Sequence, residues 1–148
     1  MQTGEPGDNI FLMKYTSYTD PSTFLSLNFN TLETSIFFQN KALTNATGYN
    51  ASDYTSDYIT YKNKDGTDVP LTIIRKKSVL PTLDHTPEKP VLTHMYAYGG
   101  FGSTEKPSFN LENIIFFRNL QGIQVIVHTR GGGELGEDWH KAGEKDHR

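Results

Sequence analysis

The 148-residue chain contains no cysteine. This absence excludes a disulfide framework and any chemistry that depends on a thiolate. No apolar stretch reaches the roughly 18 to 20 residues that a membrane-spanning helix needs, so the sequence predicts no membrane segment. Hydrophobic residues make up only 35% of the chain, which is low for a self-contained globular domain. We therefore expect long polar loops, or a core that these residues do not complete by themselves.

Concentrated charge and metal-binding patterns are also missing. The chain has 14 basic and 17 acidic residues and a net charge of −3, so it has no basic surface of the kind that binds nucleic acid. None of the histidines shows the spacing of a metal site such as H-E-x-x-H, and each is better interpreted as a solvated or packed residue. The five are His85, His94, His128, His140 and His147. We expect neither a metal nor a cofactor.

The first part of the chain has the pattern of antiparallel β-strands. Residues 10–15, 24–29 and 35–38 are rich in apolar residues, with period-two alternation in the second run, and Asp20-Pro21-Ser22 is a turn signal between them. Three such strands are too small a sheet to be stable alone. Residues 41–56 are rich in Asn, Thr, Ala and Gly, which is typical of a connector between domains.

A hairpin follows the connector. Residues 58–63 and 69–76 have strand patterns, and Asp65-Gly66 between them is a strong signal for a two-residue type I′ turn, in which both central residues need positive φ. Residues 78–89, with Pro81 and Pro87, are expected to form an exposed loop.

The last third alternates between strand and helix patterns. Residues 91–97 predict a buried strand, and residues 123–128 predict another. Between them, residues 110–120 carry apolar side chains at helical spacing, with Gly122 placed to take the left-handed position past the helix end. Strand, glycine loop, helix, strand and glycine loop in this order are typical of an α/β sheet, whose ligand crevice lies at the carboxyl ends of its strands.

The loop Tyr98-Gly99-Gly100-Phe101 follows the first of these strands. Paired glycines let backbone amides approach a ligand closely, and the phenol of Tyr98 could donate a hydrogen bond to a developing oxyanion. The alternative interpretation is a tight turn in which Tyr98 and Phe101 are only core aromatics. The sequence pattern alone leaves both open.

The second loop, Arg130-Gly131-Gly132-Gly133-Glu134, also has two interpretations. Three glycines could cradle an anion, or they could allow the loop to pass close to another segment. No Lys-Ser or Lys-Thr follows, so the loop is not a phosphate-binding P-loop, and we expect Arg130 to pair with Glu134. Farther on, Trp139 is expected to be a packing residue, although it could line a pocket, and His140 has no Ser or Asp at an informative spacing.

No serine of this chain lies in a G-x-S-x-G nucleophile motif. Ser103 follows Gly102, but it lacks the second glycine and the helix that the motif requires.

Four blocks of the sequence together resemble the prolyl oligopeptidase family. The blocks are residues 50–54, 61–70, 96–101 and 130–143. They occur in the family's order and at close to its spacing. Residues 1–47 are similar to the end of the family's β-propeller only in the rhythm of their strands.

This resemblance implies an internal fragment of a cytoplasmic serine peptidase that cleaves short proline-containing peptides after proline and is a monomer when intact. Residues 1–47 would be the last strands of the propeller, and residues 48–148 would be the start of an α/β-hydrolase domain. Tyr98 matches the family's tyrosine whose hydroxyl stabilises the oxyanion, and Phe101 matches an aromatic that lines the proline pocket. The catalytic Ser, Asp and His would lie outside these residues, so we expect the chain to be inactive alone.

Two other functions are compatible with the same sequence. The chain could be a catalytically dead piece that acts only in binding or interaction. It could also belong to another hydrolase with an α/β fold, such as an aminopeptidase or an esterase.

Overall fold

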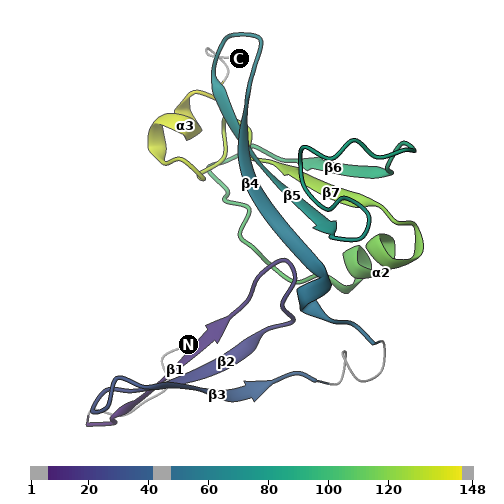
Figure 1. Cartoon of the computed structure of the whole chain (residues 1–148). Helices are drawn as coiled ribbons and strands as arrows, with labels where there is room; N and C mark the ends of the chain where they lie inside the picture. The colour runs from purple at the N-terminus through teal and green to yellow at the C-terminus, as the bar shows by residue number, and fades with distance from the viewer. Residues whose placement is uncertain (1–6, 42–47, 145–148) are drawn as a thin grey trace. The chain divides into compact units, whose positions relative to one another are not determined.

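The computed structural model describes residues 7–41 and 48–144 (Figure 1). It divides into two compact units. One holds the described residues up to Ala51 together with 107–110, and the other holds residues 52–106 and the described residues from Leu111 onward. The domain boundary expected at residue 47 falls on residues outside the described ranges, as does His147.

The first unit contains a three-stranded antiparallel sheet in the order β1-β2-β3. Its strands, at the three positions predicted from the sequence, are β1 (Ile10–Tyr15), β2 (Thr23–Asn28) and β3 (Thr34–Gln39). Aromatic side chains pair within it, because the ring centres of Phe11 and Phe29 lie 6.1 Å apart, as do those of Phe24 and Phe38. These aromatics contact each other but leave much apolar surface exposed, including Ile36 and Phe37.

The second unit contains a four-stranded sheet in the order β4-β5-β7-β6. Its strands are β4 (Tyr54–Lys62), β5 (Asp68–Lys76), β6 (Thr93–Ala97) and β7 (Ile123–Val127). Its two α-helices, α2 (Leu111–Asn119) and α3 (Glu137–Lys141), lie at opposite ends of the sheet in Figure 1. A short 3-10 turn, η1 (Ala51–Asp53), immediately precedes β4.

The pairing of β6 with β7 brings two loops to one edge of this sheet. The two strands are parallel, with Ala97 opposite Val127, while β5 runs antiparallel to both β4 and β7. The carboxyl ends of β6 and β7 therefore lie at the same edge, and the tip of the β4–β5 hairpin lies there too, because Leu71 near the start of β5 pairs with Val127. This edge is where open α/β sheets bind ligands.

The two helices cover opposite faces of the sheet with apolar side chains. On one face, Trp139 of α3 packs with Val69, Val125 and Val127. On the other face, Phe117 of α2 is completely buried, and its ring centre lies 6.1 Å from that of Tyr54. Alternate residues of a strand point to opposite faces, which explains how the apolar runs of β5 and β7 supply both cores.

Two predictions about burial were wrong. All five residues of β6 are exposed, although the apolar run 91–97 predicted a buried strand, because β6 is an edge strand whose only neighbour in the described sheet is β7. In α2, Ile114 and Phe117 are buried, but Leu111 and Ile115 of the predicted apolar stripe are about half exposed.

Two predictions about turns were also wrong. The hairpin turn is closed by the N–H of Gly66, which donates to Asn63 O at 2.9 Å. Gly66 has φ of 82° but Asp65 is not in the positive-φ region, so this longer turn is not the expected type I′ turn. After α2, Gln121 rather than Gly122 takes positive φ, at 52°. Gly122 instead provides space for the ring of Phe116, which a Cβ there would overlap.

Among the described residues, no helix is both long and apolar enough to cross a membrane.

Candidate functional site

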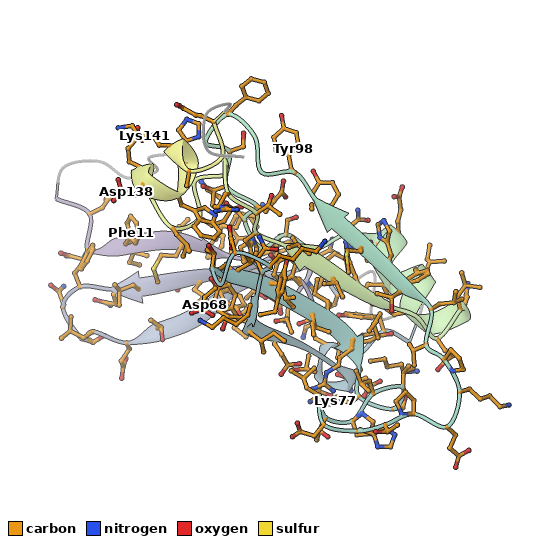
Figure 2. All side chains as sticks on the ribbon, turned by 90° about the horizontal axis from the view of Figure 1, so that it is seen from above. Phe11, Asp68, Lys77, Tyr98, Asp138 and Lys141 are labelled. Carbon is orange, nitrogen blue, oxygen red and sulfur yellow. The ribbon has the colours of Figure 1, made fainter. Side chains whose placement is uncertain are left out.

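Two aromatic side chains of the loop after β6 are exposed to solvent at the carboxyl ends of β6 and β7. Tyr98 is 51% exposed and Phe101 is 91% exposed. Figure 2 shows Tyr98 just beyond the end of β6, with its side chain directed outward. Neither side chain is therefore part of the core that the described residues form.

Phe101 combines two unfavourable features. Its φ is 56°, in the left-handed region, which is rare for a bulky residue and costs roughly 1–2 kcal/mol. Its side chain is also almost completely exposed, so local packing does not offset that strain. Strained backbone positions concentrate at ligand sites, which makes Phe101 a candidate for contact with a bound molecule.

The ring of Tyr98 lies near Gly100. A Cβ at Gly100 would lie 3.4 Å from a ring carbon of Tyr98 and 3.8 Å from its hydroxyl oxygen. These are ordinary van der Waals distances, so the phenol lies close beside residue 100 without excluding a small side chain there.

A second tyrosine lies two residues before Tyr98 and carries an acidic neighbour. The hydroxyl of Tyr96 donates to Glu105 Oε1 at 3.4 Å. The negative charge of Glu105 is the main cause that raises the pKa of Tyr96 above its ordinary value, with smaller contributions from burial, from this hydrogen bond and from Tyr98. Reasoning from the sequence missed this pair, since nothing in the spacing of 96 and 105 signals contact.

The two glycine loops cross in direct backbone contact. A Cβ on Gly99 would lie less than 3.0 Å from Thr129 Oγ1, a Cβ on Gly131 less than 3.0 Å from Gly99 O, and a Cβ on Gly133 less than 3.0 Å from Gly102 O. We call this contact between residues 99–103 and 129–133 the glycine crossing. It favours the interpretation in which the three glycines allow close passage of another segment.

Hydrogen bonds fix the glycine crossing on both sides. The N–H of Gly102 donates to Gly131 O at 2.9 Å, and the N–H of Gly133 donates to Ser103 O at 3.0 Å. The N–H groups of Gly131 and Gly132 donate to carbonyl oxygens as well, at 3.0 and 3.3 Å. All three glycine amides of the second loop are therefore engaged within the chain, which leaves none of them to cradle an anion.

Arg130 and Glu134 do not pair with each other, contrary to the prediction. Arg130 Nη2 lies 2.7 Å from Asp65 Oδ2, at the tip of the β4–β5 hairpin. Glu134 Oε1 instead accepts the N–H of Glu105 at 3.0 Å. Each side chain binds a segment far away in sequence, and each connects the second loop to another part of the sheet edge.

The pKa of the carboxyl of Asp65 is lower than its ordinary value. The main causes are the hydrogen bonds from Thr67, chiefly the one from its backbone N–H, which lies 3.0 Å from Asp65 Oδ1, with smaller contributions from Arg130.

Trp139 and His140 attach the start of α3 to the second loop. The indole N–H of Trp139 donates to Thr129 O at 3.1 Å, and Trp139 O accepts the N–H of Gly131 at 3.0 Å. The Trp139 side chain is buried against the valines of the sheet, which confirms the prediction of a packing role. Next to it, His140 Nδ1 lies 2.9 Å from Gly131 O.

A buried polar group lies beneath the second loop. His128 is 4% exposed. Its Nε2 lies 3.0 Å from Thr72 Oγ1, and its Nδ1 lies 3.5 Å from Glu134 Oε1. The prediction of a packed histidine is correct here. Among the described residues no cluster of three or more His, Cys, Asp and Glu side chains is placed to hold a metal ion.

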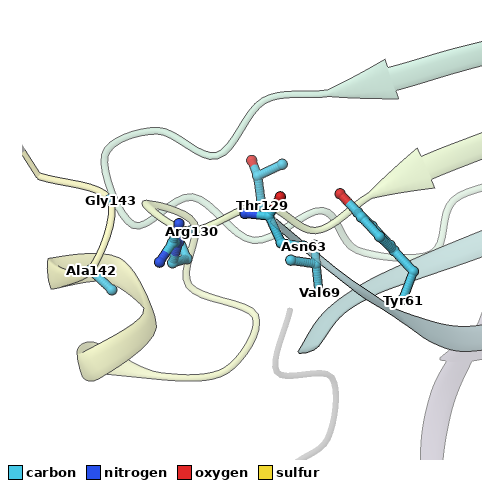
Figure 3. Close-up of a pocket in the computed structure, with 7 residues that line it drawn as sticks. All are labelled: Tyr61, Asn63, Val69, Thr129, Arg130, Ala142 and Gly143. Atoms are coloured by element: carbon cyan, nitrogen blue, oxygen red, sulfur yellow. The ribbon is translucent and has the colours of Figure 1, made fainter. Parts of the chain in front are cut away.

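A hollow of about 380 Å³ lies between the hairpin tip, the second loop and the end of α3 (Figure 3). It is lined by Tyr61, Asn63, Val69, Thr129, Arg130, Ala142 and Gly143. Neither Tyr98 nor Phe101 belongs to this lining, so the hollow is separate from the exposed aromatic pair.

Comparisons with known proteins identify the family of the chain. No family model matches the chain. Curated relatives include a prolyl endopeptidase of Elizabethkingia meningoseptica, 32% identical over 142 residues that are 96% of this chain and 18% of the relative. Another is prolyl oligopeptidase ophP of Omphalotus olearius, 35% identical over 148 residues that are 99% of this chain and 18% of the relative. In sequence, the chain belongs to the prolyl oligopeptidase family.

Solved structures of prolyl oligopeptidases have a similar fold over nearly all of this chain. A variant of prolyl oligopeptidase B from Galerina marginata, bound to a 35mer hydrolysis and macrocyclization substrate, superimposes with a TM-score of 0.79 at 28% identity. The match covers 98% of this chain and 19% of that one. Oligopeptidase B from Leishmania major shares the fold with a TM-score of 0.72 at 24% identity, over 94% of this chain and 18% of that one. The chain thus spans about a fifth of the length of the family members that it matches.

Proposed function

We propose that this chain is a segment of a serine peptidase of the prolyl oligopeptidase family that hydrolyses short peptides after proline. In this proposal residues 1–47 are the last strands of a β-propeller, and residues 48–148 are the first part of an α/β-hydrolase domain. The intact enzyme is a cytoplasmic monomer and needs no cofactor. The strand order β4-β5-β7-β6, with β6 parallel to β7, supports the second assignment.

The observation that carries the proposal is the exposure of two aromatic side chains in the loop after β6. A phenol and a benzyl side chain, Tyr98 and Phe101, stand exposed at the edge of the sheet where ligands bind, and Phe101 holds a strained backbone to do so. A water-exposed aromatic pair has little stabilising effect on the fold, whereas both side chains suit contact with a peptide.

The mechanism that follows is acyl transfer. A serine attacks the carbonyl carbon of the prolyl residue, a histidine takes the proton of the serine hydroxyl, and the negative charge moves to the carbonyl oxygen. In this segment Tyr98 donates its hydroxyl proton to that oxygen as a hydrogen bond, which is stronger in the transition state than in the ground state. Phe101 contributes apolar surface to the pocket for the proline ring.

The test is Tyr98→Phe in a complete prolyl oligopeptidase that carries residues 52–148 of this chain in place of its own matching stretch. Loss of one oxyanion donor lowers turnover by roughly 100- to 1000-fold. Tyr96→Phe is the matched control, since it removes a hydroxyl from the same strand end, and it is expected to change turnover less than about threefold. Equal effects of the two substitutions would contradict the role of Tyr98. A chimera that shows no preference for proline, but cleaves esters or amino-terminal residues, would favour another α/β-hydrolase.

By itself the 148-residue chain is proposed to be inert, because its sequence holds no G-x-S-x-G motif. A fluorophosphonate probe, which reacts with activated serine, should leave the chain unlabelled. Stoichiometric labelling of this chain would refute that part of the proposal.

A further inference from the structure

The carbonyl of Gly131 is the point where three segments of the second unit meet. Its oxygen accepts the N–H of Gly102 at 2.9 Å, and it lies 2.9 Å from His140 Nδ1. Because a carbonyl oxygen can only accept, His140 must carry its proton on Nδ1, and the bond fixes its tautomer. One oxygen thus joins the loop after β6, the loop after β7 and helix α3.

The imidazole of His140 also lies close beside the first loop. Its ring atoms lie 3.6 Å from the position that a Cβ of Gly102 would occupy, which is an ordinary van der Waals distance. Gly102 immediately follows Phe101 and has φ of 65°. The ring therefore lies beside Gly102, the residue next to Phe101. Its Nδ1 is hydrogen-bonded to Gly131 O, the oxygen that also accepts the N–H of Gly102.

Further contacts restrict the movement of His140. Its backbone N–H donates to Gly136 O at 3.1 Å, and its neighbour Trp139 is buried in the core. The side chain of His140 is 29% exposed, and its Nε2 lies 4.0 Å from Glu144 Oε1.

We propose that His140 is a positioning residue that sets the place of Tyr98 and Phe101 by holding Gly131 O and Gly102. The expected effect of His140 on catalysis rests on the proposed function. Its expected effect on the position of the loop after β6 does not. His140 acts through the backbone of the first loop and not on the substrate. Both the hydrogen bond to Gly131 O and the position of the ring beside Gly102 involve backbone atoms of the loops.

Two substitutions of His140 separate the effect of its hydrogen bond from the effect of side-chain size. Asparagine places an amide N–H close to where Nδ1 lies, whereas glutamine places its N–H closer to the position of Nε2. In the 148-residue chain, His140→Gln should speed hydrogen exchange of the Gly102 amide by about 3- to 10-fold, the size expected for one neutral hydrogen bond. His140→Asn should leave it within about twofold, and the amide of Val125 in the core strand serves as reference. Equal exchange rates in the two variants, or a Gly102 amide that is unprotected in the wild type, would overturn the positioning role.

A second measurement uses the chimeric peptidase described above. His140→Gln should lower kcat/KM by roughly 10- to 100-fold, because a misplacement of about 1 Å can have that effect, and His140→Asn should restore most of it. In a Tyr98→Phe background the same substitution should lower kcat by less than about threefold, since the hydroxyl that His140 helps to place has been removed.

The two measurements separate the two proposals. If Gly102 exchange responds as expected but neither Tyr98→Phe nor His140→Gln changes turnover, the positioning role stands and the proposed function fails. If Tyr98→Phe impairs turnover and His140→Gln does not, the proposed function stands and the positioning role is wrong.

Discussion

Replacement of Gly131 by alanine tests the glycine crossing at its closest contact between two backbones. Gly131 has φ of 98°, and a Cβ there would lie less than 3.0 Å from the carbonyl oxygen of Gly99. Two separate terms should destabilise the variant. A left-handed backbone costs a residue with a side chain roughly 1–2 kcal/mol. An overpacked contact with backbone that has to move costs roughly 1–3 kcal/mol.

Alanine substitutions at two other glycines measure the backbone term and the packing term separately. Gly66 has φ of 82° but lies in open space, so Gly66→Ala carries only the backbone term. Gly143 is not in the positive-φ region, yet a Cβ there would lie less than 3.0 Å from the backbone of Gly131, so Gly143→Ala carries only the packing term. Gly131→Ala should lower the free energy of unfolding by about the sum of the two, on the order of 2–5 kcal/mol.

Urea unfolding followed by circular dichroism measures all three variants. With a denaturant slope of about 1–3 kcal/mol per molar, the midpoint for Gly131→Ala should fall by roughly 1 M or more. The midpoints of the two control variants should lie between that value and the wild type. If Gly131→Ala unfolds at the same urea concentration as Gly66→Ala, the loops are not in close contact and the argument for the crossing fails.

Two further predictions concern side chains near the same edge. Trp139→Phe keeps most of the packing but removes the hydrogen bond to Thr129 O, so it should lower the free energy of unfolding by about 1–2 kcal/mol, against about 3–5 kcal/mol for Trp139→Ala; equal losses in urea unfolding would show that the hydrogen bond, not the packing, dominates. Glu105→Gln should bring the pKa of Tyr96 down toward its ordinary 10.0, measured by NMR titration of carbon-13-labelled tyrosine. Because the raised pKa means that the folded state holds this proton more tightly, its contribution to stability is present below pH 10 and declines as the pH rises through the pKa of the folded protein. An unchanged Tyr96 pKa in Glu105→Gln would refute the assigned cause.

The strands were predictable from the sequence because each is specified by a local pattern. Strand patterns located each of the strands in the described residues, although β4 begins at Tyr54, inside the stretch 41–56 that was predicted to be a connector. Their surroundings were not predictable in the same way. The run 91–97 indicated that its side chains are apolar, but the pattern holds no information on whether another strand or helix lies beside them. The exposure of Met95 and Tyr96 follows from the position of β6 at the sheet edge.

The site could be located from the sequence, but its contacts could not be deduced. Glycines after two strand patterns indicated that the loops at 98–102 and 130–134 lie at one edge. Arg130 was assigned to Glu134 because the two are close in sequence, whereas its partner Asp65 is brought near only by the pairing of β5 with β7. His140 was set aside because no Ser or Asp lies at an informative spacing from it. Its partner is a backbone carbonyl, which has no signature in a sequence.

The chain holds a single tryptophan, and Trp139 is bonded through its indole to the carbonyl of Thr129. Its intrinsic fluorescence therefore reports the environment of one known residue, next to the loop that follows β7. A red shift in emission would signal water reaching that indole, and quenching by acrylamide would time how often it becomes accessible. The protein thus contains its own optical probe of this edge, with no dye or label to be added.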